Sequence, residues 1–255
     1  MKSFLLFIML SMVSAIATAS VGAKPTAYTE KVMFERFDGM KKHFYEASLK
    51  SGMAMEDIVA FASIESGIRS NVRNGSGSSA TGVLQYTNRT WKQDRKRYHK
   101  ELGLPANVDV KNPRANLLIG ATSLVKTKEF LIEKSHLTMD TVRVGDLYMS
   151  HFLGENGAVR VLNAKSGTPM NQLYTISKGN RPLFYKPNGQ VRTAREFRQH
   201  MDYLIKRERA FYLEKVKEHE LAMMNKKRQR LVDSFYDNSI MMAITSTYTP
   251  PVFNS

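Results

Sequence analysis

The chain has 255 residues, 42% of them hydrophobic, and no cysteine, so it can build a sizeable core that does not depend on disulfides. Its 38 Lys and Arg residues exceed its 23 Asp and Glu residues and give a formal charge of +15 at pH 7. Such a surface attracts polyanions, namely phosphate-bearing wall polymers, anionic lipids or nucleic acid. Nucleic acid ranks last, because the sequence has no aromatic-studded basic loop and no recognised DNA-reading motif.

Residues 1–19 have the three-part layout of a secretory signal peptide. One lysine precedes an apolar run from Phe4 to Ile16, and the small residues Ala17 and Ala19 follow it. The run is shorter than the roughly 20 apolar residues that a membrane-spanning helix needs. We therefore expect export with cleavage after Ala19, and a retained N-terminal anchor is the alternative.

An amphipathic helix that ends in an acidic residue is the most informative element. Ile58, Phe61 and Ala62 occur at i, i+3 and i+4, and Glu65 takes position i+7 of the same apolar stripe. A carboxylate on a buried face loses hydration, so its pKa should rise and it should stay protonated near neutral pH. A general acid needs this property. Gly67 is predicted to cap the end of this helix.

The flanking segments supply further start and stop signals. Ser51 is predicted to cap the start of the Glu65 helix, and residues 73–81, rich in Gly and Ser, are predicted to form a mobile loop. A helix is predicted from Thr90 to Glu101. Asn112 followed by Pro113 is a strong helix start, and this helix should run to about residue 133.

The next helix carries two polar aromatic side chains on one face. Val144, Leu147, Tyr148 and His151 fall at i, i+3, i+4 and i+7, and Gly154 ends the pattern. The local pattern leaves two interpretations of Tyr148 and His151 open. They are either hydrogen-bonded core residues or residues that contact a substrate.

The rest of the chain reads as short helices, one hairpin and a long basic helix. Short helices are expected over 157–163 and after Pro169, and residues 182–190 are expected to form a hairpin. A capping box from Thr193 to Glu196 opens a basic amphipathic helix over 193–237. Residues 238–255 show no helical period and are expected to be disordered or bound to a partner.

The order of several motifs resembles the lytic transglycosylase family (soluble lytic transglycosylase, goose-lysozyme-like). The motifs are Glu65-Ser66, the segment SATGVLQ at 79–85, Thr90-Trp91 and Asn112-Pro113, and the similarity extends over about 57–164. The family's later Tyr-Asn-x-Gly block corresponds here to HFLG at 151–154. Ser79 also stands where the family prefers glycine. The departure at His151-Phe152 is closer to the phage- and conjugation-associated branch.

The resemblance implies a mainly α, lysozyme-like domain over residues 30–190 that acts on peptidoglycan glycan strands. Glu65 would act as acid and then as base to cleave the MurNAc-GlcNAc β-1,4 bond and form 1,6-anhydroMurNAc ends. Ser66 would orient Glu65, and Gln85 would line the cleft. Tyr148 and His151 would contact the substrate or the acid. Trp91 is expected in the core.

Two other functions fit the same residues. One is a hydrolytic muramidase of the same fold. The other is a structural component of a phage particle or secretion channel, in which the wall-cleaving domain is degenerate and the C-terminal helix binds another protein of the complex. No cofactor is expected, and no His, Asp and Glu cluster has metal-ligand spacing. The expected location is periplasmic or cell-wall associated, or virion-associated for a phage gene. A chain ending at Gln190 is expected to retain activity.

Overall fold

A computed structural model describes residues 27–73 and 79–247 of the chain. The expected signal peptide, residues 74–78 of the expected mobile loop, and residues 248–255 of the expected tail lie outside these ranges. The helices are α1 (Ala27–Ser51), α2 (Met55–Ser66), α3 (Asn88–Tyr98), α4 (Pro113–Lys134), α5 (Val144–Leu153), α6 (Glu155–Asn163), α7 (Met170–Leu173), the 3₁₀ turn η1 (Lys178–Asn180), α8 (Arg181–Phe184) and α9 (Ala194–Thr247).

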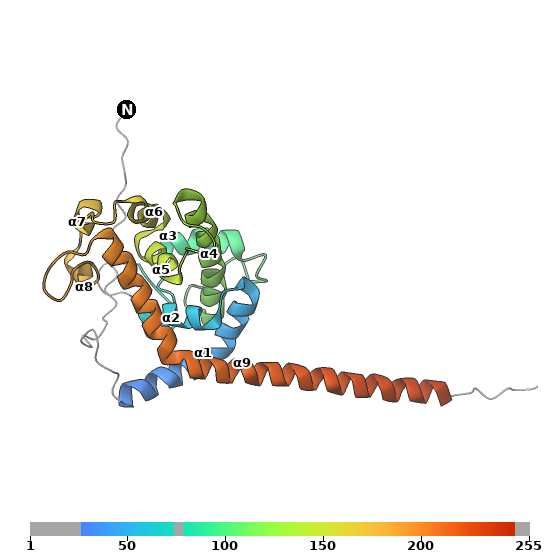
Figure 1. Ribbon diagram of the computed structural model, residues 1–255. Coiled ribbons are helices and arrows are strands. Elements are labelled where there is room, and N and C mark those ends of the chain that lie inside the picture. Colours follow the sequence, from blue (N-terminus) through green and yellow to red (C-terminus); the bar gives the residue numbers. More distant parts are fainter. Residues whose placement is uncertain (1–26, 74–78, 248–255) are drawn as a thin grey trace, which may run out of the picture. The chain divides into compact units, whose positions relative to one another are not determined.

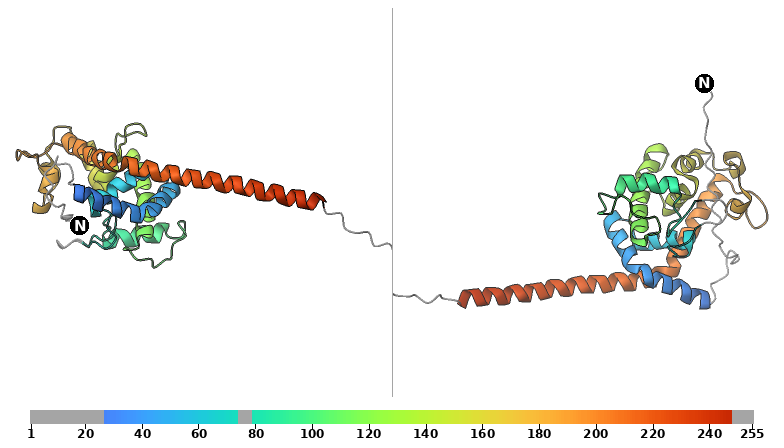
Figure 2. Two further views of the ribbon diagram at one scale, coloured as in Figure 1. Left: turned by 90° about the horizontal axis from the view of Figure 1, so that it is seen from below. Right: turned by 180° about the vertical axis from the view of Figure 1, so that it is seen from behind.

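The mainly α fold predicted from the sequence is confirmed. In the described ranges, extended backbone pairs only as isolated bridges. The described residues as far as Leu213 form one compact unit, and those from Glu214 onward form a second. In the first unit, α1 packs on α4 and on α2 (Figures 1 and 2).

Helix α2 is the central helix of the first unit. All five residues from Ile58 to Ala62 have no exposed surface. A helix that is apolar on every side is buried on every side, so the stripe that the sequence shows is only part of its contact surface. The unit is therefore built around the helix that carries Glu65.

The two ends of α2 differ in how well the sequence predicts them. Gly67 ends the helix with φ of 60°, as predicted, and its N–H donates to the Ser63 carbonyl. The predicted N-cap is wrong. Ser51 is instead the last residue of α1, where its hydroxyl donates to the Ala47 carbonyl and accepts from the Met53 N–H. These bonds close α1, and α2 begins after them at Met55.

The other helix boundaries of the first unit lie at or within about three residues of the predicted positions. Asn112 caps α4 by accepting from the Ala115 N–H at 3.0 Å, and Gly154 follows α5 as expected. Helix α3 begins slightly earlier than predicted, because Thr87 rather than Thr90 is its N-cap. It also ends at Tyr98, three residues before the predicted end.

The predicted hairpin is reduced to a turn with one bridge. Tyr185 and Val191 form an isolated antiparallel bridge, and the Lys186 N–H donates to the Gln190 carbonyl. Pro182 does not extend a strand but lies in the first turn of α8. Proline is suited to this position because the first helical N–H groups have no intrahelical partner.

The first part of α9, residues 194–213, belongs to the first unit. The capping box that opens α9 is present, since the Thr193 N–H donates to Glu196 Oε2 at 2.9 Å and the Glu196 N–H donates to Thr193 Oγ1. The boundary expected near residue 193 is therefore wrong, because the apolar stripe of this segment packs inside the domain. Its buried apolar residues are Phe197, Met201, Leu204, Ile205 and Tyr212.

Ion pairs attach residues 194–213 to α2 and α5, the two helices that carry the candidate site. Arg198 on α9 donates to both oxygens of Asp146 on α5, at 2.6 and 2.9 Å, and Asp146 is fully buried. Arg209 on α9 pairs with Glu56 at 3.0 Å and with Asp57 at 3.1 Å at the start of α2. Removing one partner of a buried pair leaves an uncompensated charge, which destabilises the folded state.

The second unit is helical as far as Thr247, so the loss of structure expected from residue 238 is wrong for residues 238–247. Ion pairs one turn apart, such as Lys215 with Glu218 and Lys217 with Glu214, occur along it. Across the described part of the chain, no helix combines the length and the apolar composition needed to cross a membrane.

We predict that a chain ending at Gln190 fails to fold, in contrast to the expectation from the sequence. It would lose Phe197, Met201 and Tyr212 from the core, and each large buried side chain contributes about 2–5 kcal/mol. Domains are stable by only about 5–15 kcal/mol. Circular dichroism melts should show a cooperative transition for a chain ending at Asn225 and none for the shorter chain. A full cooperative transition in the shorter chain would contradict this account.

Candidate active site

Glu65 lies on the last turn of α2 and is only 1% exposed. Burial raises the pKa of its carboxyl group to about 8, and a hydrogen bond from Tyr148 acts in the opposite direction. Burial has this effect because the charged form loses more hydration than the neutral form. At pH 7 the carboxyl group therefore retains its proton, as its place on the apolar stripe predicts.

Tyr148, on α5, is brought against Glu65 and is itself buried. Its ring packs edge-on against Phe61 of α2, with centroids 5.4 Å apart. Burial, together with the neighbouring Glu65, raises the pKa of the Tyr148 hydroxyl well above its ordinary value. The hydroxyl thus keeps its proton and donates a hydrogen bond to the Glu65 carboxylate when that group ionises.

His151 lies one turn further along the same face of α5. Its Nε2 atom is 3.0 Å from the Leu84 carbonyl oxygen and 4.0 Å from Glu65 Oε2. Burial lowers the pKa of the imidazole to about 4, so the ring is neutral at pH 7 and does not form an ion pair with Glu65. A carbonyl oxygen can only accept, so Nε2 carries the proton and donates it to Leu84.

Ser66 and Gln85 hold the backbone around the acid. The Ser66 hydroxyl donates to the Ala62 carbonyl at 3.1 Å. Its single proton is therefore directed at the backbone, whereas the family resemblance implied that Ser66 orients Glu65. Gln85 is buried, and its amide nitrogen donates to the Gly82 and Val72 carbonyls at 2.9 and 3.1 Å. One of these bonds therefore closes the turn, and the other ties it to the segment after α2.

Asn116 is a site-supporting residue that the sequence analysis missed. It is fully buried on α4, where its Oδ1 accepts from the Leu84 N–H and its Nδ2 donates to the Val110 carbonyl, both at 2.9 Å. A side chain at Gly82 would lie 2.5 Å from Asn116, so the turn depends on glycine there. The available signal was an amide among apolar residues, in the segment ANLLIG at 115–120 of α4.

Other buried acids of the first unit have partners of their own. Burial and Tyr148 are the causes of the shift in the pKa of Glu65. Asp57 pairs with Arg209, and Glu208 accepts from the Ser63 hydroxyl at 2.6 Å. In the ranges that the structure describes, no three His, Asp or Glu side chains cluster as metal ligands would.

Aromatic rings surround the acid on the side of the 81–86 turn. The ring of His151 lies edge-on to both Phe61 and Tyr86, at 6.2 and 6.3 Å. Trp91 packs edge-on against Tyr86 at 5.4 Å and is 6% exposed, which confirms that it belongs to the core. The acid is thus held in apolar surroundings, which explains its raised pKa.

Comparison with protein families adds an independent observation. Residues 42–137 match the family model described as "Transglycosylase SLT domain". The matched range contains Glu65, Ser66 and Gln85, and it ends before α5 with Tyr148 and His151. No curated protein is similar enough to the chain to be matched. The fold is accordingly the mainly α, lysozyme-like one, and the match supports a relationship to the lytic transglycosylases and a peptidoglycan substrate.

We predict that Tyr148→Phe slows peptidoglycan cleavage by about tenfold or more, as for a lost hydrogen bond to a charged group. The Tyr148 hydrogen bond lowers the pKa of Glu65, so its loss should move the alkaline limb of the rate to higher pH. A pH profile of turnover on purified sacculi measures both effects. Tyr174→Phe removes a hydroxyl that donates to the Gly157 carbonyl and serves as the control. An unshifted alkaline limb would argue against the hydrogen bond.

We also predict that His151→Ala lowers turnover more than it lowers the melting temperature. The alanine variant loses the N–H that holds the Leu84 carbonyl beside the acid, whereas His151→Gln keeps a donor at a similar reach. Turnover on sacculi and thermal melts of both variants provide the comparison. Equal losses of activity and stability in the alanine variant, without recovery in the glutamine variant, would identify His151 as a core residue only.

Proposed function

We propose that the protein is a peptidoglycan lytic transglycosylase that cleaves the MurNAc-GlcNAc β-1,4 bond and leaves 1,6-anhydroMurNAc ends. The observation that carries this proposal is the buried carboxyl group of Glu65, whose pKa of about 8 keeps it protonated at neutral pH. Its position inside the range that matches the transglycosylase family model supports the choice of substrate.

In the first step, Glu65 donates its proton to the glycosidic oxygen of the departing sugar. A carboxyl group that is still protonated at pH 7 can act as a general acid there. The carboxylate that forms accepts the hydrogen bond from the Tyr148 hydroxyl, which limits the cost of a buried negative charge. Proton transfer and charge stabilisation thus involve adjacent groups on α2 and α5.

In the second step, Glu65 takes a proton from the 6-hydroxyl of the MurNAc residue whose glycosidic bond has been cleaved. A carboxylate whose conjugate acid has a pKa of about 8 is a stronger base than an ordinary glutamate, which suits this role. The 6-oxygen then closes on the anomeric carbon and gives the anhydro product without consuming water. One residue can perform both steps because the first step produces the carboxylate that acts as the base in the second, and the second step restores the protonated acid.

Participation of the substrate can replace a second carboxylate. Most glycosidases use two carboxylates around an oxocarbenium-like centre, and enzymes assisted by the substrate are exceptions. The buried acids Asp57 and Glu208 bind Arg209 and Ser63, so we infer that the substrate's N-acetyl group supports the cation. The neutral His151 adds no charge at this position.

The address and the partners outside the site are part of the same proposal. The signal-like N-terminus supports export to the periplasm or cell wall, or into a virion if the gene belongs to a phage. The cations Lys226, Lys227, Arg228 and Arg230 support attraction to an anionic wall polymer or membrane surface. The His151-Phe152 block supports the phage- or conjugation-associated branch, in which another protein of the complex would bind the C-terminal helix.

We predict that Glu65→Gln leaves the fold intact and reduces lysis by about 10²–10⁴-fold, the usual value of general acid–base catalysis. The amide has nearly the same size but cannot exchange the proton. Turbidity clearing of purified sacculi measures the loss, and circular dichroism checks the fold. Glu133→Gln makes the same chemical change at an exposed position near the end of α4 and should clear sacculi at close to the wild-type rate. Retained clearing by Glu65→Gln would remove Glu65 from the mechanism.

Mass spectrometry of sacculi digested by the wild-type protein distinguishes the remaining functions. Anhydro ends support transglycosylation, and reducing ends would instead identify a hydrolytic muramidase. Sacculi that remain intact would favour the structural role with a degenerate domain.

The Glu65→Gln substitution should also change how the stability of the fold depends on pH. The pKa of Glu65 rises from 4.5 to about 8 on folding, so its neutral form stabilises the folded state below pH 4.5. This contribution is lost as the pH rises through about 8. We expect the melting temperature of the wild type to fall relative to that of Glu65→Gln across this window. A constant difference between the two proteins would contradict the assigned pKa.

A further inference from the structure

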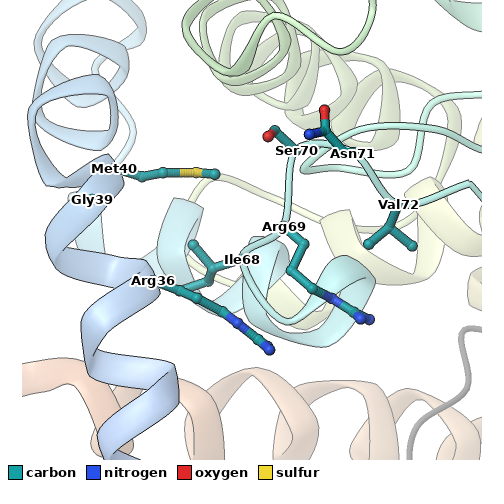
Figure 3. A pocket seen from close by; sticks show the side chains of 8 residues that line it. All are labelled: Arg36, Gly39, Met40, Ile68, Arg69, Ser70, Asn71 and Val72. Carbon is teal, nitrogen blue, oxygen red and sulfur yellow. The ribbon is translucent and has the colours of Figure 1, made fainter.

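A surface pocket lies beside the end of the helix that carries Glu65. It has a volume of about 500 Å³ and lies between α1 and the segment that follows α2, residues 68–72 (Figure 3). Arg36 lines it from α1, and Arg69 lines it from the segment after α2. The mechanism derived above uses neither arginine.

Both guanidinium groups are anchored at the carboxyl end of α2. Arg36 Nη1 donates to the Gly67 carbonyl at 3.1 Å, and Arg69 Nε donates to the Ser66 carbonyl at 2.7 Å. A Cβ atom at Gly67 would lie 3.3 Å from Arg36 Nη1 and 3.9 Å from Arg69 Nε, so the two groups flank one backbone position. Figure 3 shows the two side chains extending in the same direction.

Within residues 27–73 and 79–247, no ion pair neutralises this concentration of positive charge. Among the residues that the structure describes, neither Arg36 nor Arg69 pairs with an acidic side chain, and the bonds found for their side chains go to backbone carbonyls. Each guanidinium has five N–H groups and uses one of them in these bonds. The remaining groups have the fork geometry that binds a carboxylate through two parallel hydrogen bonds.

The rest of the lining favours a short peptide over a polyphosphate. Met40, Ile68 and Val72 offer apolar contacts, and Ser70 and Asn71 add a hydroxyl and an amide. The apolar residues can contact small apolar side chains such as that of alanine, and the hydroxyl and amide can bond to peptide backbone groups. A chain of phosphates would leave the apolar part of the pocket without a partner.

We propose that this pocket binds a carboxylate of the peptide that muramic acid carries in peptidoglycan. The proposal rests on the proposed function, because it takes the glycan strand as the substrate. The peptide is attached to the muramyl ring next to the cleaved bond, and the lining of the pocket after α2 begins at Ile68, three residues after Glu65. Binding there would fix which bond of the strand meets the acid, and would favour strands that still carry their peptides.

Gly39 allows a test that leaves both arginines in place. It lines the pocket from the middle of α1, and a Cβ atom there would have no heavy atom within 4 Å. Gly39→Glu adds a carboxylate at the pocket, and Gly39→Gln adds a neutral side chain of the same size. Both residues form helices more readily than glycine, so neither should disturb α1.

The kinetic experiment compares full-length variants on glycan strands with and without peptides. We expect Gly39→Glu to raise KM about tenfold relative to Gly39→Gln on peptide-bearing strands, the factor for one lost charged hydrogen bond, and to leave KM unchanged on strands stripped by an amidase. Arg69→Gln retains an amide donor for the Ser66 carbonyl and should act like Gly39→Glu. Arg195→Gln, an exposed arginine at the start of α9, is the control for charge. Equal changes of KM on both kinds of strand would overturn the proposal.

A binding measurement separates this proposal from the proposed function. N-acetylmuramyl tripeptide is titrated into the wild-type protein, Gly39→Gln and Gly39→Glu by calorimetry, which needs no cleavage. Binding by the first two proteins and its loss in the third support the pocket, even if no strand is cleaved. Failure of the wild-type protein to bind the peptide would overturn the pocket, even if sacculi are lysed.

Discussion

The candidate site depends on the removal of one carboxyl group, that of Glu65, from water. A buried carboxylate is costly, and the group meets this cost by keeping its proton up to a pKa of about 8. That state requires α2 to be enclosed on all sides up to its last turn. The enclosure by neighbouring helices is therefore a condition for the chemistry as well as for stability. Tyr148 provides a hydrogen bond that stabilises the ionised form during reaction.

Residues 194–213 of α9 contribute to this enclosure, although they lie far from every motif in the sequence. Glu208 accepts from the Ser63 hydroxyl at 2.6 Å, two residues before the acid, and Arg198 forms a two-bond pair with the buried Asp146 of α5. Gly145 of α5 is so close to α9 that a Cβ atom there would lie 2.5 Å from the Asp202 Cα atom. These contacts fix α2 and α5 relative to each other, and with them the pair Glu65 and Tyr148.

The turn over residues 81–86 forms the opposite side of the site through backbone contacts. The Leu84 N–H donates to Asn116 on α4, and its carbonyl accepts from His151 on α5. Gln85 adopts a positive φ of 49°, and its amide closes the turn on the Gly82 carbonyl. His151 and Gln85, which the sequence suggests as substrate ligands, thus hold the backbone of this turn.

The sequence alone determined the features that arise from local periodicity and local capping. The place of Glu65 on a buried stripe, the end of α2 at Gly67 and the start of α4 at Asn112 all follow from residues within one or two helical turns. Tertiary structure decided the rest. An apolar stripe predicts that a partner exists but not which one, so α9 was assigned to a separate extension although its residues 194–213 complete the core. Likewise, Ser66 and Gln85 could bind substrate or backbone with the same atoms. The Ala62 carbonyl lies one turn before Ser66 in the same helix, so local geometry already supplies that partner. Only the packed chain brings the Val72 carbonyl within reach of Gln85.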